Sequence, residues 1–157
     1  MSDKPKRMAI IAGKGNLDEA YPPLILASTA AALDFEVAIF FTFYGLNIVN
    51  KKKLKKLKMS PVGNTGMPMP IPNFIGGLPG MTAMTTTMMK SWMSSAGVAT
   101  IPDLLEACIE GEVQLIACQM TMDVLKIDRK DLIDELDVGG AATFLEFAQD
   151  ADITMYM

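Results

Sequence analysis

Two short apolar runs with an apolar helical stretch between them most strongly limit what this chain can fold into. Residues 7–13 form an apolar run that ends in glycine, which is typical of a buried parallel strand. After a turn at 14–19, a largely buried helix is predicted to carry the Pro22–Pro23 pair in its first turn, because missing N–H groups cost little there. Residues 36–42 are rich in β-branched and aromatic side chains and predict a second strand. Together these elements predict a βαβ unit with parallel strands.

The second half of the chain repeats this alternation. Thr100 is predicted to cap a helix over 103–110 that ends at Gly111, and residues 113–118 predict a third strand. The elements expected after it are short helices at about 121–126 and 129–136, a longer helix over about 140–149 and a closing strand at 153–157. Such alternation predicts one α/β domain over 1–157, built on a doubly wound, mostly parallel sheet of four to five strands.

Residues 51–95 interrupt the pattern and predict an insertion within the domain. It begins with a run of lysines at 51–58, continues through a Met-, Pro- and Gly-rich stretch at 59–80, and ends in a segment over 81–95 that favours an amphipathic helix. Its prolines and glycines break any helix long enough to cross a bilayer, so no membrane span is expected. The lysines could make peripheral contact with anionic lipid, at about 1 kcal/mol each, or be a solvated helix start. The methionines could form a lid, a subunit contact or a partner surface, with Cu(I) binding as the alternative.

Composition excludes several kinds of chemistry. The chain has no histidine, which rules out Ser-His-Asp and Cys-His catalysis and the commonest zinc sites, so no metal and no cofactor are expected. The net charge of −4 gives no reason to expect a nucleic-acid partner. Two cysteines do not make a secreted disulfide framework, and the apolar run at 8–12 is too short for the core of a signal peptide. A reducing cytoplasm is therefore the expected compartment.

Cys118 is the candidate reactive residue. It lies where the strand at 113–118 should end and a helix should begin, so free N–H groups and the positive end of that helix would favour a thiolate. Backbone N–H groups around Gln119, Met120 and Thr121 would stabilise this charge, and Thr121 would cap the helix. The alternative is a small buried residue at the end of a core strand, because free cysteine is among the most buried residue types.

Cys108 is expected to be a core residue. It lies one helical turn from Leu104 and Leu105, on what should be the packing face of its helix. It could resolve an oxidised Cys118 only if the two cysteine Cα atoms come within about 7 Å.

Two loops after the first and second strands are expected to wall a pocket at the edge where Cys118 lies. Their residues are Gly13, Lys14, Gly15, Asn16, Tyr44 and Gly45. A glycine pair after a first strand occurs in phosphate sites, but neither the dinucleotide fingerprint nor the P-loop pattern is present. A tight turn is the favoured interpretation, with nucleotide or small-anion binding as the alternative.

Four segments in order along the chain, at 10–15, 40–45, 116–123 and 139–145, resemble the DsrE-like group of the DsrE/DsrF superfamily, which are small sulfur-relay proteins. The resemblance covers nearly the whole chain, and the insertion is similar to that of a subgroup often labelled peroxiredoxin-like. The thioredoxin-type pattern that peroxidase chemistry would need is absent. The resemblance implies a Rossmann-like or flavodoxin-like three-layer fold, homo-oligomers that are often trimers or larger, and a sulfane-sulfur-carrying cysteine that maps onto Cys118.

The function implied is that of a sulfur carrier or sulfurtransferase. It would hold sulfur as a Cys118 persulfide or thiosulfonate and pass it to a partner thiol, with proteins or small thiols as donors and acceptors. Stoichiometric carriage and catalytic turnover both need the same residues, so the enzyme class stays open. Two other functions also stay open: a small-ligand-binding or regulatory module in which Cys118 is structural, and a membrane-peripheral scaffold built on the insertion.

Overall fold

The fold is built on a parallel β-sheet. The structure, a computed structural model, describes residues 4–60, 62, 66 and 71–157. Its strands are β1 (Arg7–Ala12), β2 (Glu36–Phe41), β3 (Gln114–Cys118), β4 (Asp137–Gly139) and β5 (Ile153–Tyr156). Within the described residues they pair in the order β4-β3-β2-β1-β5, and every neighbouring pair is parallel.

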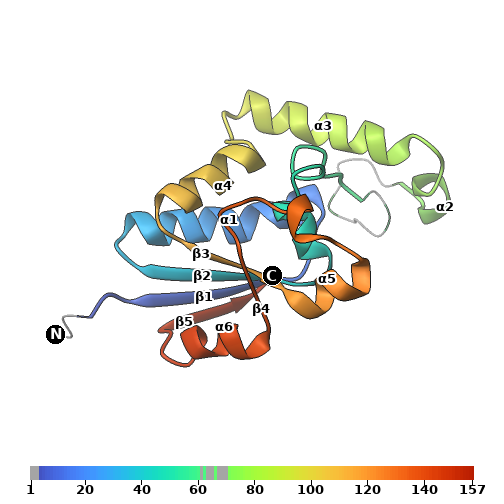
Figure 1. Ribbon diagram of the computed structural model, residues 1–157. Helices are drawn as coiled ribbons and strands as arrows, with labels where there is room; N and C mark the ends of the chain where they lie inside the picture. The colour runs from blue at the N-terminus through green and yellow to red at the C-terminus, as the bar shows by residue number, and fades with distance from the viewer. Residues whose placement is uncertain (1–3, 61, 63–65, 67–70) are drawn as a thin grey trace.

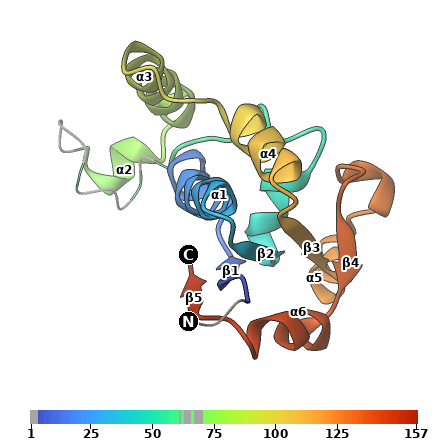
Figure 2. The ribbon, with the colours of Figure 1, turned by 90° about the vertical axis from the view of Figure 1, so that its left-hand side faces the viewer.

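Helices cover both faces of this sheet. The α-helices are α1 (Leu17–Ala32), α2 (Asn73–Gly76), α3 (Met81–Ser95), α4 (Ile101–Glu110), α5 (Gln119–Leu125) and α6 (Ala141–Ala148), and the 3₁₀ helices are η1 (Phe43–Val49) and η2 (Arg129–Asp131). Figure 1 shows α1 and α4 on one face and α6 on the other, and Figure 2 gives the same layers in a view turned by 90°. The predicted α/β class, a mostly parallel sheet flanked by helices, is confirmed.

Alternate residues of the central strands face two separate apolar clusters. Residues such as Ile10 and Leu115 belong to the main core on the side of α1 and α4. Their neighbours in sequence belong to a smaller cluster, in which Phe40 of β2 stacks on Phe144 of α6 with ring centroids 5.2 Å apart. Because side chains alternate with period two along a strand, Cys118 is assigned to the smaller cluster, on the side of α6.

The first helix begins earlier than predicted. Helix α1 starts at Leu17, directly after the extended Asn16, and so includes much of the expected turn at 14–19. Pro22 and Pro23 therefore lie inside the helix, where each removes a backbone hydrogen bond instead of occupying the first turn. Burial offsets this cost, because one side of the helix, including Tyr21, is packed into the main core.

The segment predicted as a helix at 129–136 is mostly an irregular loop. Only η2 is helical, and β4 follows as an edge strand that the sequence pattern did not predict. The Arg129 guanidinium stabilises this loop, because it donates hydrogen bonds to several of its main-chain carbonyls. Its acceptors include the oxygens of Ile133 at 2.7 Å, Asp134 at 2.9 Å and Leu136 at 2.7 Å.

Helix α4 begins close to its predicted start. The Thr100 hydroxyl accepts a hydrogen bond from the Asp103 N–H (3.3 Å), and the Asp103 carboxylate accepts one from the Thr100 N–H (3.0 Å). This reciprocal capping box satisfies two N–H groups at the helix start, and the helix ends at Gly111.

The insertion is anchored to the domain at its first residues. Lys51 and Lys52 form ion pairs with Asp134 (2.8 Å) and Asp131 (2.9 Å). The lysine run forms turns and not the start of a helix. Leu57, just beyond these turns, is buried in the main core, so the insertion is continuous with the domain packing.

The later part of the insertion lies outside the three layers. Helix α3 matches the predicted helix at 81–95 and lies beyond α1 and α4 in both views (Figures 1 and 2). Pro61, Pro68 and Pro70, which were expected to break this stretch, lie outside the described residues. Among the residues that are described, no helix has the length and apolar character needed to cross a membrane.

Backbone approaches backbone at the carboxyl edge of the sheet. A Cβ atom added to Gly45 would lie 2.0 Å from the Ala12 carbonyl oxygen, and one added to Gly15 would lie 2.1 Å from the Tyr44 carbonyl oxygen. Both positions therefore require glycine, and the loops after β1 and β2 are held in direct contact.

We expect Gly45→Ala to lower the free energy of unfolding by about 2 kcal/mol or more, because the loop after β2 must move away from Ala12. Urea unfolding measures this change. Gly77→Ala is the matched control: its backbone lies in the right-handed helical region (φ −80°), the new methyl group would meet its nearest neighbours at ordinary contact distances of 3.6 and 3.8 Å, and the change should stay below about 0.5 kcal/mol. Equal unfolding midpoints for the two variants would contradict the close approach at Gly45.

Candidate functional site

Cys118 lies at the junction of β3 and α5. It is the last residue of the strand and the N-terminal cap residue of the helix, with an extended backbone (φ −69°, ψ 112°). Helix α5 begins at Gln119, two residues earlier than predicted, so Thr121 lies inside the helix and does not cap it. The first N–H groups of α5 consequently adjoin the thiol and have no partner within their own helix.

Two hydroxyl groups and two backbone amides stabilise the Cys118 thiolate. Burial taken alone would raise the pKa of the thiol. Hydrogen bonds from the hydroxyl and N–H of Thr121 act against it, and the Thr42 hydroxyl and the Met120 N–H add to them. The net result is a Cys118 pKa below the ordinary value for cysteine.

A hydrogen-bond network fixes the hydroxyl groups beside the thiol. The Thr121 hydroxyl oxygen accepts from the Phe43 N–H (3.0 Å) and lies 3.2 Å from the Thr42 hydroxyl oxygen. Phe43 has a left-handed backbone (φ 46°), which is uncommon for a residue with a side chain, and this conformation accompanies the donation from its N–H to Thr121. The end of β2 therefore takes part in positioning the donors around Cys118.

The thiol is close to the surface but covered. Cys118 is 5% exposed, whereas the adjoining Met120 and Phe43 are 56% and 51% exposed. The Gln119 side chain is turned along the helix, where its amide donates to Asp123 (2.9 Å). A thiol at a strand end is expected to be exposed enough to be attacked; the structure shows one that is nearly buried, with the exposed residues Met120 and Phe43, here called the rim, beside it.

Cys108 has the opposite environment. It is fully buried in the main core, as predicted, and its thiol donates to the Leu24 carbonyl oxygen at 3.5 Å. Burial raises its pKa to about 11, so it remains a neutral thiol at physiological pH. Cys118 belongs to the cluster on the other side of the sheet, and both cysteines are free. Of the two cysteines, Cys118 is therefore the one whose pKa is lowered.

The loops predicted to wall one pocket with Cys118 enclose a separate small hollow. Its volume is about 160 Å³. The residues that line it are Gly13, Lys14, Gly15, Asn16, Glu19, Tyr44 and Asn47. Lys14 forms an ion pair with Glu19 (3.2 Å), and the Asn16 amide donates to the same carboxylate (2.9 Å), which reduces the positive charge available to an anion.

The structure therefore divides the predicted site residues into two groups. Gln119, Met120 and Thr121 adjoin Cys118, whereas the hollow is formed by the loops after β1 and β2. Gly45 is a packing residue, because a Cβ atom at this position would clash with the Ala12 carbonyl oxygen.

Thr42 is a neighbour of the thiol that the sequence pattern did not predict. Its position follows from the strand register, because Phe41 of β2 pairs with Ala117 of β3 and places the next residues, Thr42 and Cys118, at the same level. Without knowing that β2 and β3 are neighbours, no sequence signal identifies this contact. Among the described residues, no group of three or more His, Cys, Asp or Glu side chains could hold a metal ion.

Comparison with known proteins supplies the family. A sequence model of the DsrE/DsrF/DrsH-like family matches residues 4–156. The chain is 52% identical over 158 residues to the protein named "Sulfur carrier protein DsrE2" of Allochromatium vinosum, covering 97% of this chain and 98% of that protein. It is 35% identical over 167 residues to the protein YrkE of Bacillus subtilis, covering 100% of both.

A solved structure shares the fold. The crystal structure of the ychN protein from E. coli superimposes with a TM-score of 0.55 over 97% of this chain and 99% of that chain. At 12% sequence identity this similarity concerns the fold alone. The family match and the two relatives establish the rest: the chain belongs to the DsrE/DsrF/DrsH-like family.

Proposed function

We propose that this protein is a sulfur carrier in which the Cys118 thiolate takes up sulfane sulfur and passes it to a partner thiol. The observation that carries the proposal is the set of donors around Cys118, which lowers the pKa of that thiol while burial raises the pKa of Cys108. The name of the Allochromatium vinosum relative, a sulfur carrier, supports the same role for a chain 52% identical to it.

The transfer needs no metal and no separate general base. The Cys118 thiolate attacks the outer sulfur of a donor persulfide, a new S–S bond forms, the donor S–S bond breaks, and the donor leaves as a thiolate. An acceptor thiolate then attacks the outer sulfur on Cys118 and releases the Cys118 thiolate. Tetrathionate reacts in the same way, leaving one thiosulfate group on Cys118 and releasing the other. In each reaction one S–S bond forms and one S–S bond breaks, so neither needs an external oxidant or reductant.

The covering of Cys118 suits a carrier. The outer sulfur of a persulfide needs room that a thiol at 5% exposure does not have, so the rim formed by Met120 and Phe43 must move when sulfur or a partner arrives. Once the rim closes, a held sulfur atom is shielded from water and small thiols. A partner thiol that opens the rim would then be favoured over free small thiols as the acceptor.

The partners, the turnover, the oligomeric state and the compartment of the protein are part of the same proposal. Donors and acceptors are proteins or small thiols, transfer is either stoichiometric or catalytic, and the working form is a homo-oligomer in the cytoplasm. No specific observation favours the ligand-binding alternative at the small hollow, because Lys14 there is already paired with Glu19.

The first test is the intact mass of the reduced protein after incubation with a sulfane-sulfur donor or with tetrathionate. The parent and the Cys108→Ser variant should each gain one sulfur atom or one thiosulfate group, and Cys118→Ser should gain neither. No adduct on any protein, with the Cys118 thiol shown to be free and reduced, would overturn the carrier proposal. An adduct that persists in Cys118→Ser would overturn the assignment to Cys118.

Thr121→Val should raise the pKa of Cys118. The change keeps the side-chain shape but removes the hydroxyl that stabilises the thiolate, so the neutral thiol gains relative to the charged form. The pH profile of Cys118 alkylation should move to higher pH, and the alkylation rate at neutral pH should fall. Thr87→Val, on the exposed side of α3, is the control and should leave the profile unchanged. Circular dichroism confirms that both variants are folded, and an unshifted profile in folded Thr121→Val contradicts the role of this hydroxyl.

A further inference from the structure

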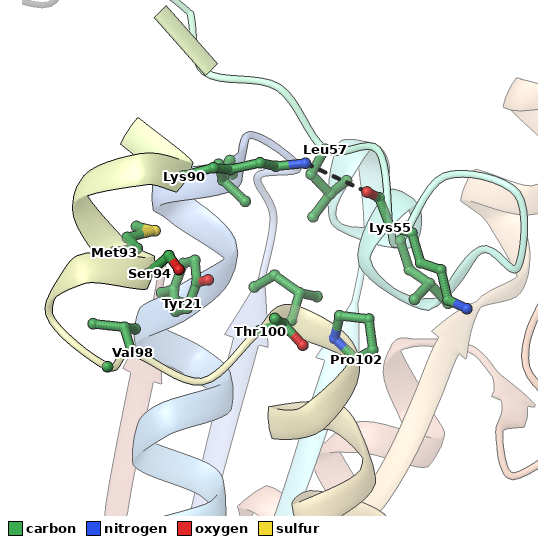
Figure 3. A pocket seen from close by; sticks show the side chains of 13 residues that line it. Tyr21, Lys55, Leu57, Lys90, Met93, Ser94, Val98, Thr100 and Pro102 are labelled. Carbon is green, nitrogen blue, oxygen red and sulfur yellow. Dashed lines mark hydrogen bonds between the residues drawn. The ribbon is translucent and has the colours of Figure 1, made fainter. Parts of the chain in front are cut away.

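A larger cavity lies on the other side of the sheet from Cys118. Its volume is about 570 Å³, within the range of roughly 300–1,000 Å³ that is usual for small-molecule sites. It is enclosed by α1, α3, the start of α4 and residues 54–57 (Figure 3). Its buried wall residues belong to the main core, whereas Cys118 belongs to the cluster beside α6. The cavity is therefore independent of the proposed sulfur site.

Most of the cavity wall is apolar. The apolar side chains come from four separate parts of the chain: Leu17, Leu54, Leu57, Met93, Val98 and Ile101. Such a lining favours the hydrocarbon part of a ligand, at about 25 cal/mol for each Å² of apolar surface that leaves water.

Tyr21 places a hydroxyl group on this wall without a protein partner. The residue is only 9% exposed, yet its hydroxyl forms no hydrogen bond with any described residue. Burial, with a smaller contribution from the negative charge of Asp103, raises the pKa of Tyr21, so the group stays protonated and can donate. Ser94 of α3 lines the same cavity, and Figure 3 shows both side chains at its wall. A ligand with an oxygen acceptor would satisfy both groups.

Lys90 supplies positive charge at the mouth. Its side chain reaches from α3 across the opening toward residues 54–57, where Nζ donates to the Lys55 carbonyl oxygen at 3.4 Å (Figure 3). Lys55 also lines the cavity, and no Asp or Glu does so among the described residues. Neither lysine forms an ion pair with a carboxylate in the described part of the chain. The lining therefore carries two positive charges and no negative one, which favours an anionic head group, while the Asp103 carboxylate acts on Tyr21 from outside the lining.

From these observations we propose that the cavity binds a monomeric anionic amphiphile, of the class of long-chain carboxylates. The alkyl chain packs against the apolar wall, and the carboxylate lies near the mouth, where it accepts hydrogen bonds from Tyr21 and Ser94 and an ionic contact from Lys90. Helix α3 forms one side of the site and is joined at each end through a glycine with positive φ, Gly80 (90°) and Gly97 (70°).

Isothermal titration calorimetry of the full chain with dodecanoate, kept below its micelle concentration, tests this proposal. Saturable binding of one dodecanoate per chain is expected. Ser94→Phe fills the cavity and should weaken binding on the order of tenfold or more. Ser91→Phe makes the same change one turn earlier on the same helix, at an exposed residue that does not line the cavity, and should bind like the parent.

The head-group contacts are tested separately. Lys90→Gln should weaken dodecanoate binding ~5-fold at low salt, whereas Lys56→Gln, an exposed lysine outside the cavity, should not change it. Tyr21→Phe removes only the hydroxyl and should also weaken binding. Dodecanol, which carries no charge, should bind equally to the parent and to Lys90→Gln.

The outcomes separate a ligand cavity from a membrane-contact surface. Absence of saturable dodecanoate binding, or equal binding to folded Ser94→Phe and to the parent, overturns the proposal. Sedimentation with anionic vesicles without binding of the monomeric carboxylate also overturns it and assigns the surface to a membrane contact. Cys118→Ser should bind dodecanoate like the parent, so failure of the sulfur-carrier proposal would leave this one intact.

Discussion

Burial of the sheet on both faces is the constraint on which the rest of this structure depends. The central strands carry apolar side chains at successive positions, and a strand can bury all of them only if each face of the sheet is covered. Helices α1 and α4 cover one face and α6 the other. The period-two alternation along β3 then decides which layer each side chain enters, and it assigns Cys118 to the thinner layer beside α6, at the end where the strand reaches the surface.

The lowered pKa of Cys118 comes from this position and not from an acid–base partner. A chain without histidine cannot activate a thiol through an imidazole, and this one uses fixed dipoles in its place: hydroxyl groups from α5 and the end of β2, and amides at the start of α5. Cys108 shows what the same side chain does without such donors, because in the main core burial dominates and its pKa rises to about 11. Location relative to the strand ends separates a thiol with a lowered pKa from one with a raised pKa.

The two faces of the sheet differ in what they hold. The face toward α6 holds the nearly buried thiol, while the face toward α1 and α4 is extended by the insertion. Residues 54–57 and α3 complete a cavity that the three layers alone do not form. Lys51, Lys52 and the buried Leu57 anchor the first part of the insertion to the domain. The cavity wall formed by residues 54–57 is therefore held in place by the domain.

Elements with strong local signals could be predicted from the sequence. The apolar runs of β1, β2 and β3, the Thr100 cap and the position of Cys118 at a strand end all depend on neighbours along the chain. Other features depend on contacts between distant residues. Helix α1 tolerates its two internal prolines because its other side chains are buried, and Arg129 holds an irregular loop ahead of β4 by binding main-chain carbonyls. The 3₁₀ helix η1 had no sequence signal.

The features of the candidate site also separate into those that the sequence determines and those that the tertiary structure determines. The sequence by itself determined that one of the two cysteines would stand between a strand and a helix, in a chain unable to use histidine. Only the tertiary structure decided that Thr42 would lie beside that cysteine, that the loops around Lys14 would enclose a separate hollow, and that α3 would close a cavity over Tyr21. The physical reason is that local propensity acts between residues close in sequence, whereas strand order and helix packing bring together residues that the sequence keeps far apart.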